Sequence, residues 1–149
     1  MFVATLALSA VLAATAPQQT GPQLFDPNRD PQRDLWAAIE TATTQHKRIL
    51  LDVGGNWCGW CRLLDRTITD DKEISEFLAA HFVVIRVNFS PENRNKIFLS
   101  CFPEINGYPH YFVLHSDGTL LHSQRTDVLE AGKGYNRALL FQFFRRWAQ

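Results

Sequence analysis

Two apolar runs and one pair of segments around a turn signal dominate the pattern of hydrophobic and polar positions. Residues 49–53 and 82–88 are short runs rich in Ile, Leu and Val, which predicts two buried β-strands. Residues 111–114 and 119–122 flank Asp117-Gly118, a dipeptide that favours a tight turn between antiparallel strands. The pattern therefore predicts a β-sheet that includes a hairpin.

Apolar residues at helical spacing predict helices between and around these strands. Asp71 is the type of residue that caps a helix N-terminus, and Ser90-Pro91-Glu92 is a helix-entry signal. Strands and helices in this order indicate an α/β fold in which a central mixed β-sheet is flanked by helices. The expected helices cover about residues 34–45, 58–66, 71–81, 90–99 and 136–147.

The N-terminal segment has the character of an export signal. Residues 1–16 carry no charge, are almost all apolar and end in Ala14-Thr15-Ala16, a pattern typical of signal-peptidase sites. They depart from the usual pattern because no Lys or Arg precedes the apolar stretch and Pro17 follows the expected cut. Since a spanning helix needs about 20 residues, stable membrane insertion is not expected. We interpret the protein as exported, either periplasmic or secreted.

The rest of the chain divides into a linker and one domain. Residues 17–32 are rich in Pro, Gln and Asp and lack periodicity, which predicts a linker. Residues 33–149 have the length of a single domain, and 46% hydrophobic and 12% aromatic residues in the chain are enough to fill a core.

The most specific chemical feature is the run Trp57-Cys58-Gly59-Trp60-Cys61. It follows a predicted strand and precedes a predicted helix, so Cys58 is expected at a helix N-terminus. There, unpaired backbone N–H groups and the positive end of the helix dipole favour the thiolate, which is the reactive form of a thiol. The motif therefore indicates reversible disulfide exchange.

Two other interpretations of these cysteines remain open. A static staple is possible, although closing so short a loop stabilises the fold by only about 2 kcal/mol in the chain-entropy relation. A zinc site would need two further ligands, and Cys101, His110, His115 and His122 form no second close pair, so no metal and no cofactor is expected. Cys101 itself is expected to be a small buried hydrophobic residue, with an exposed third thiol as the alternative.

With its cysteine motif, Asp52 six residues before Cys58, and Gly107-Tyr108-Pro109 ahead of a strand, the chain resembles thioredoxin-fold proteins over about residues 33–148. Among them it is most similar to secreted or periplasmic thioredoxin-like proteins with a short helical N-terminal extension. The resemblance implies that Asp52 is a buried acid and that Pro109 follows a cis peptide bond and packs against the disulfide. In the position where thioredoxins often carry a lysine facing that acid, this chain has Arg86.

These features predict a thiol–disulfide oxidoreductase. Cys58, at the helix start, is expected to be the exposed nucleophile, and Cys61, one turn inside, would resolve the mixed disulfide. Asp52 would have a raised pKa and relay a proton to or from Cys61. His110, next to Pro109, is close enough in sequence to tune the Cys58 thiolate.

The expected substrates are extended protein segments. By resemblance, the backbone of Tyr108 beside Pro109 would pair with such a segment, a form of strand addition. Trp57 and Trp60 would form an apolar rim for the partner, with Trp60 the more exposed of the two.

Charge and composition define the expected partners. The 15 basic and 15 acidic residues cancel, so attraction to nucleic acid or to an anionic membrane is not indicated. We expect a monomer that acts on proteins with thiols or disulfides and is served by a redox partner protein. Gly59-Trp60 carries no charge or imidazole, which favours a reductant or mild exchanger over a strong oxidant. The alternative function is a non-catalytic thioredoxin-fold binding module with a static Cys58–Cys61 disulfide.

Overall fold

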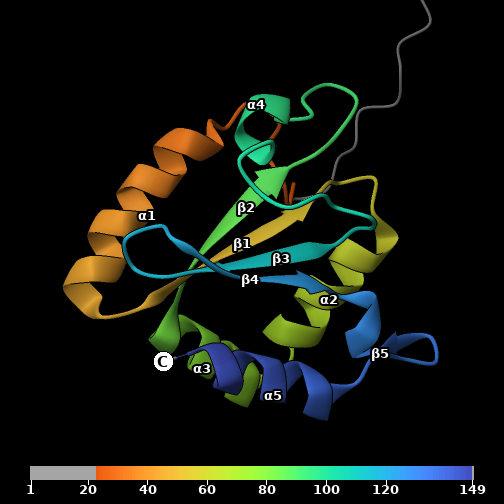
Figure 1. Ribbon diagram of the computed structural model, residues 1–149. Helices are drawn as coiled ribbons and strands as arrows, with labels where there is room; N and C mark the ends of the chain where they lie inside the picture. Colours follow the sequence, from red (N-terminus) through yellow and green to blue (C-terminus); the bar gives the residue numbers. More distant parts are fainter. Residues whose placement is uncertain (1–22, 149) are drawn as a thin grey trace, which may run out of the picture.

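The computed structural model describes residues 23–148 and shows a central sheet between two layers of helices (Figure 1). The sheet has the strand order β2-β1-β3-β4. Strand β1 (Arg48–Gly54) runs parallel to β2 (Phe82–Asn88) and antiparallel to β3 (His110–Leu114), which pairs in turn with antiparallel β4 (Leu120–Arg125). The predicted α/β fold with a mixed sheet is confirmed.

The helices lie on both faces of this sheet. Helix α1 lies on one face, while α2, α3 and α5 lie on the other (Figure 1). A short helix α4, a single 3-10 turn η1 (Asp127–Leu129) and a small hairpin, β5 with β6, complete the described chain. The bounds of these elements are α1 Pro31–Gln45, α2 Gly59–Thr69, α3 Lys72–His81, α4 Lys96–Leu99, β5 Glu130–Ala131, β6 Gly134–Tyr135 and α5 Arg137–Trp147.

Alternation along β1 separates two hydrophobic cores. Successive side chains of a strand point to opposite faces of the sheet. Ile49, Leu51 and Val53 accordingly pack with α1 and α4, whereas Leu50 packs with α2, α3 and α5. Asp52 shares the face of Leu50, so a carboxyl group lies where the pattern of the strand calls for an apolar side chain.

Helix α1 begins three residues earlier than predicted. Asp30 caps it by accepting hydrogen bonds from the backbone N–H groups of Gln32 and Arg33, and Pro31 occupies the first helical position. This is the favoured arrangement at a helix start, because a first-turn proline has no N–H that needs a partner. Residues 31 and 32, which we assigned to a linker, therefore belong to α1. The predicted signal peptide, residues 1–16, lies outside the described residues.

The helix expected over residues 90–99 is wrong in its first half. The side-chain amide of Asn88 donates to the Ser90 hydroxyl and to the carbonyl of Asn93, which closes a loop at the helix-entry signal. Asn95 adopts a left-handed backbone with φ of 48°, and a single helical turn, α4, follows. Side-chain to backbone hydrogen bonds of this kind compete with helix formation.

Candidate redox site at the start of helix α2

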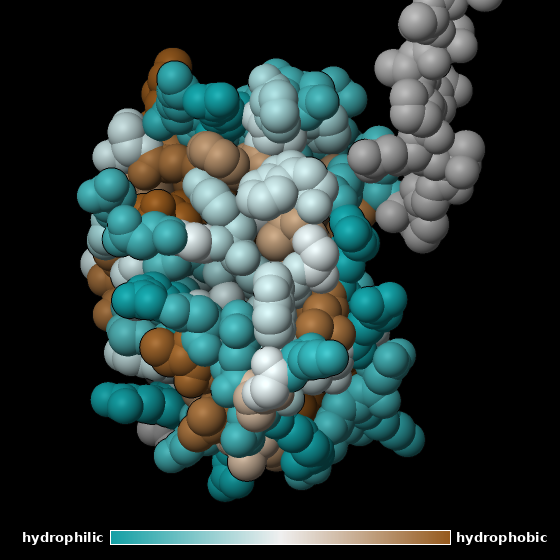
Figure 2. All heavy atoms as spheres, turned by 90° about the vertical axis from the view of Figure 1, so that its right-hand side faces the viewer, coloured by the Kyte–Doolittle hydropathy of each residue, from teal (hydrophilic) through white to brown (hydrophobic). Residues whose placement is uncertain are grey.

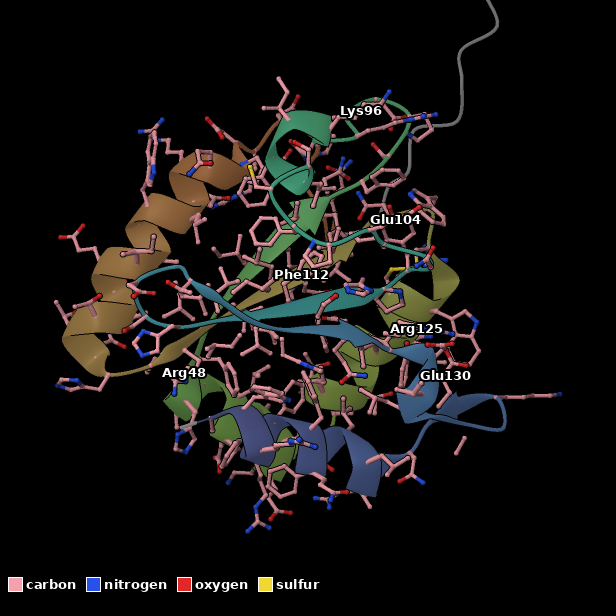
Figure 3. The ribbon with its side chains drawn as sticks, viewed as in Figure 1. Arg48, Lys96, Glu104, Phe112, Arg125 and Glu130 are labelled. Carbon is pink, nitrogen blue, oxygen red and sulfur yellow. A yellow bond between two sulfur atoms is a disulfide. The ribbon has the colours of Figure 1, made fainter. Side chains whose placement is uncertain are left out.

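The two cysteines lie where β1 leads into α2, at the opposite end of the strand from Arg48 (Figure 3). Cys58 is the N-cap of α2 and is joined to Cys61 by a disulfide. Its Sγ atom accepts a hydrogen bond from the backbone N–H of Cys61 at 3.1 Å. A sulfur in this position faces the positive end of the helix dipole, which stabilises a thiolate.

Both cysteines are buried, contrary to the expectation that Cys58 is exposed. Their residues are 4% and 2% exposed, respectively. The cover comes partly from Phe25, which is fully buried and packs in the same cluster, with Trp60 and Tyr108 at its margin. Entry of a protein thiol to the disulfide therefore requires these side chains to shift.

The segment that carries Phe25 is held by a side-chain clasp. The side chain of Asn56 accepts a hydrogen bond from the backbone N–H of Phe25 at 3.0 Å and donates one to its carbonyl at 2.6 Å. A second asparagine, Asn93, donates to the carbonyl of Pro27 at 2.8 Å. Sequence reasoning missed Phe25 and Asn56, although a lone aromatic residue in a polar stretch was a usable signal.

Asp52 lies on β1 under this site, two residues before Gly54. It is 8% exposed, and its Oδ1 atom is buried without a hydrogen-bond partner. Burial raises the pKa of Asp52 from its usual 3.8 to about 7, with a lowering contribution from Arg86 and a raising one from Asp65. A carboxyl group with this pKa can both accept and donate a proton near neutral pH.

Arg86 lies beside Asp52, as expected, since the two residues are paired in the β1–β2 register. Its guanidinium group, however, does not form an ion pair with Asp52: Nη2 of Arg86 donates to Oδ1 of Asp65 on α2 at 2.5 Å. Asp65 was not singled out from the sequence. Its place four residues after Cys61 puts both on one face of a helix, which was the available signal.

Tyr108 and Pro109 directly precede β3, and the peptide bond between them is cis. The hydroxyl group of Thr126 donates to the carbonyl of Pro109 at 2.6 Å. The Tyr108 ring stacks on Phe89 at 4.7 Å between centroids and meets Trp57 edge-on at 5.8 Å. These contacts hold the segment in one position relative to the residue that precedes Cys58.

The expectation that Trp60 is the more exposed tryptophan is wrong. Trp57 is 51% exposed, and its indole N–H donates to the carbonyl of Phe89 at 2.7 Å. Trp60 is only partly exposed, because it packs edge-on against Tyr135 with ring centroids 5.6 Å apart. The tertiary contact comes from the β5–β6 hairpin, which sequence periodicity did not predict.

His110 does not carry a positive charge that could tune Cys58. It is buried, and its Nε2 atom is 2.9 Å from the Ser123 hydroxyl. Burial lowers the pKa of His110 to about 4, with further lowering by His122 and Arg125, so the imidazole is neutral at pH 7.

The expectation that Cys101 is buried is also wrong. Cys101 is a free, exposed cysteine that follows α4. Phe98 and Phe102 point to the core instead, and Phe102 stacks on Phe112 with ring centroids 4.9 Å apart. Two large aromatic side chains outcompete a small thiol for the buried positions of one helical turn.

Neither a metal cluster nor a membrane span is found in the part of the chain that the structure describes. Within residues 23–148, no three His, Cys, Asp or Glu side chains gather closely enough to hold a metal ion. Within the same residues, no helix combines the length and apolar character that a bilayer crossing requires. The face that carries the disulfide end of the sheet shows small hydrophobic areas among hydrophilic ones (Figure 2).

A disulfide at a helix N-terminus, set at the end of a mixed sheet with helices on both faces, defines a thioredoxin-like domain. The chain belongs to the thioredoxin-like family, whose profile matches residues 30–116. The match covers Asp52, both cysteines of the motif and Pro109. The predicted thioredoxin-like fold is therefore confirmed.

Individual relatives agree with this assignment. The chain is 25% identical over 117 residues to the thiol:disulfide interchange protein DsbD of Pseudomonas fluorescens, covering 78% of this chain and 18% of that protein. A disulphide isomerase from Xylella fastidiosa has a similar structure, with a TM-score of 0.74, 24% identity, and coverage of 85% of this chain and 97% of the isomerase. The oxidised C-terminal domain of Neisseria meningitidis DsbD gives a TM-score of 0.54 at 19% identity, covering 78% and 95% of the two chains.

The buried carboxyl group predicts a pH-dependent stability difference for Asp52→Asn in the oxidised protein. Between pH 4 and 7 the unfolded chain loses the Asp52 proton while the folded chain keeps it, so the free energy of unfolding falls as pH rises. Asparagine does not titrate, so the free energy of unfolding of the variant should rise relative to that of the parent over this window. The difference should reach at most about 4 kcal/mol above pH 7. Urea unfolding from pH 4 to 8 measures the difference, and a constant difference at every pH would contradict it.

The packing of Phe25 predicts that Phe25→Ala exposes the disulfide. Dithiothreitol should reduce the variant several-fold faster than the parent, and the fold should lose about 3 kcal/mol of stability through the missing ring. Phe25→Leu, which keeps an apolar cover, is the matched control and should stay near the parental rate. Equal rates for the alanine variant and the parent would show that Phe25 does not limit access.

Proposed function

We propose that the protein is a thiol–disulfide oxidoreductase that exchanges disulfides with exported protein substrates. The observation that carries this proposal is the pairing of a disulfide at the N-terminus of α2 with a buried acid, Asp52, on the strand beneath it. A purely structural staple needs no titratable group at that place. Burying an unpaired carboxyl group costs stability, so its presence favours a role in proton transfer.

Cys58 is the proposed nucleophile. In the reduced protein its thiolate attacks one sulfur of a substrate disulfide, forms a mixed disulfide and releases the other substrate sulfur as a thiolate. The N-terminus of α2 stabilises the attacking thiolate. Access to a substrate requires displacement of the cover over Cys58, as its 4% exposure in the oxidised state indicates.

Cys61 is the proposed resolving residue. Its thiol passes a proton to the carboxylate of Asp52, and the resulting thiolate attacks Cys58 Sγ, which releases the second substrate sulfur. The Cys58–Cys61 disulfide forms as the substrate gains two electrons and two protons in total. A redox partner protein then returns the two electrons to this disulfide, or the same steps run in reverse when the protein acts as an oxidant.

The substrate surface proposed from the sequence involves Trp57, Trp60, Tyr108 and Pro109. The exposure of Trp57 and its contact with Tyr108 support a binding surface on that side of the disulfide. An extended segment would pair with the backbone of Tyr108 beside Pro109 and rest on Trp57. Trp60, held against Tyr135, contributes less exposed area.

Export and partner class belong to the same proposal. The apolar leader, residues 1–16, supports export to the periplasm or the medium. The name of the Pseudomonas relative, a thiol:disulfide interchange protein, supports partners that carry thiols or disulfides. This chain covers 18% of that relative, so we propose the exchange chemistry without its remaining functions, and we propose a monomer.

The alternative is a binding module in which the disulfide is a static staple. The observation that favours this alternative is that both cysteines are buried in one cluster with Phe25. A reduction potential measured against glutathione separates the two functions. We expect a value between about −270 and −120 mV, the range of exchange proteins, whereas a value below about −300 mV is typical of structural disulfides and would favour the module.

Trapping tests the assigned cysteine roles. Because Cys101 is exposed, the experiment uses a Cys101→Ser background. Cys61→Ser should accumulate mixed disulfides with proteins of the exported compartment through Cys58, whereas Cys58→Ser should trap few, because its remaining thiol lies inside α2 and away from the N-cap that stabilises a thiolate. Non-reducing gels and mass mapping of the linked cysteine measure both. Equal yields from the two variants would refute the nucleophile and resolver assignment.

A further inference from the structure

The helix-covered face around Asp52 holds two acids and one cation. Asp52 and Arg86 are register partners on parallel strands, which places their backbones about 4.8 Å apart and their side chains on the same face. Arg86 is thus well placed to neutralise the buried acid. The Arg86 guanidinium instead bonds to Asp65 at 2.5 Å, and Oδ1 of Asp52 is left without a hydrogen bond.

Solvent exposure explains why the cation pairs with Asp65. The side chains of Arg86 and Asp65 are 43% and 24% exposed, so this pair keeps much of its hydration. A pair with Asp52 would draw the guanidinium into the region where Asp52 is 8% exposed, and desolvation there opposes pairing. Asp65 on α2, at the margin of the buried region, thus offers the guanidinium a partner that costs less desolvation than Asp52 does.

We propose that Asp65 is a positioning residue that holds the Arg86 guanidinium away from Asp52 and so keeps this buried carboxyl group available for proton exchange with Cys61. The inference deepens the proposed function and rests on it. Arginine does not give up its proton, so an Asp52–Arg86 pair would keep the acid permanently ionised. Such a carboxylate would be a poor acceptor for the Cys61 proton.

The proposed positioning residue, Asp65, lies on the same helix as the redox motif. Cys61 and Asp65 are four residues apart in α2 and lie on one side of it. The other ionisable groups that face Asp52 are Tyr111, its register partner on β3, and Tyr135 on β6. Burial raises the pKa of both tyrosines, so they are neutral at pH 7 and do not replace Arg86 as a counter-charge.

The direct test is the titration of the Asp52 carboxyl group by carbon-detected NMR in the oxidised protein. Asp65→Asn removes a negative charge that raises the pKa of Asp52 and frees Arg86 to approach it, so Asp52 should titrate at least about one pH unit lower than in the parent. Arg86→Gln removes the cation and should shift the titration upward. An unchanged Asp52 titration in Asp65→Asn would overturn the proposal.

A matched control breaks a different ion pair. Nε of Arg137 on α5 donates to Oδ2 of Asp71 at 2.5 Å, a distance equal to that of the Arg86–Asp65 bond. Arg137→Gln should leave the Asp52 titration where it is in the parent, because that pair does not contribute to the pKa of Asp52. A shift as large as that of Asp65→Asn would overturn the proposal, because the effect would then be a general result of losing a surface ion pair.

If Asp65→Asn does not fold, the Asp52 titration in Arg86→Gln is the test, because its expected shift is upward. This variant is expected to fold, because the Arg86 side chain lies partly in solvent. A titration that stays at the parental pH in Arg86→Gln would overturn the inference. The pH profile of mixed-disulfide resolution should follow the NMR shifts in both variants, and a profile that does not move would count against a role in proton exchange. Absence of exchange in the parent would refute the proposed function, while the titrations still decide whether Asp65 positions Arg86.

Discussion

The close approach between the end of β1 and the disulfide is the constraint on which the rest of the site depends. A Cβ atom at Gly54 would lie 2.6 Å from Cys61 Sγ and 2.8 Å from Cζ of Phe25, distances that no side chain can occupy. The absence of a side chain at Gly54 lets the sulfur rest on the strand itself. It also brings the ring of Phe25 to the same point, so strand, helix and N-terminal segment meet at one residue.

From this contact the position of the acid follows. Asp52 precedes Gly54 by two residues on the same face, about 7 Å along the strand, so its carboxyl group lies beneath the cysteine pair and is largely buried. The fold accepts an unpaired buried carboxyl group there, although Leu50, the preceding residue on that face of β1, packs in an apolar core. Local departures from the rule that buried polar groups are paired are typical of functional sites.

The redox motif lies in a setting that combines protection and reactivity. Helix α2 offers its N-terminus to Cys58, while Phe25 and the clasp by Asn56 keep water and thiols from the bond. An apolar cover also lowers the local dielectric response, which strengthens the effect of each nearby charge. For this reason, which of the two acids pairs with Arg86 has a larger effect on the Asp52 carboxyl group here than it would have on an open surface.

Local pattern determined the four strands of the main sheet, most helices and the position of the Cys58–Cys61 motif at a helix start, because hydrophobic periodicity and motif spacing depend on neighbours within a few residues. The β2 strand, for example, has the bounds that its apolar run predicts. Only the tertiary structure decided exposure and pairing: it turned Cys101 outward, covered Trp60 and buried the cysteines under Phe25. These outcomes depend on contacts between segments far apart in the chain, such as the 31 residues that separate Phe25 from Asn56, and no local pattern encodes which distant group wins a buried position.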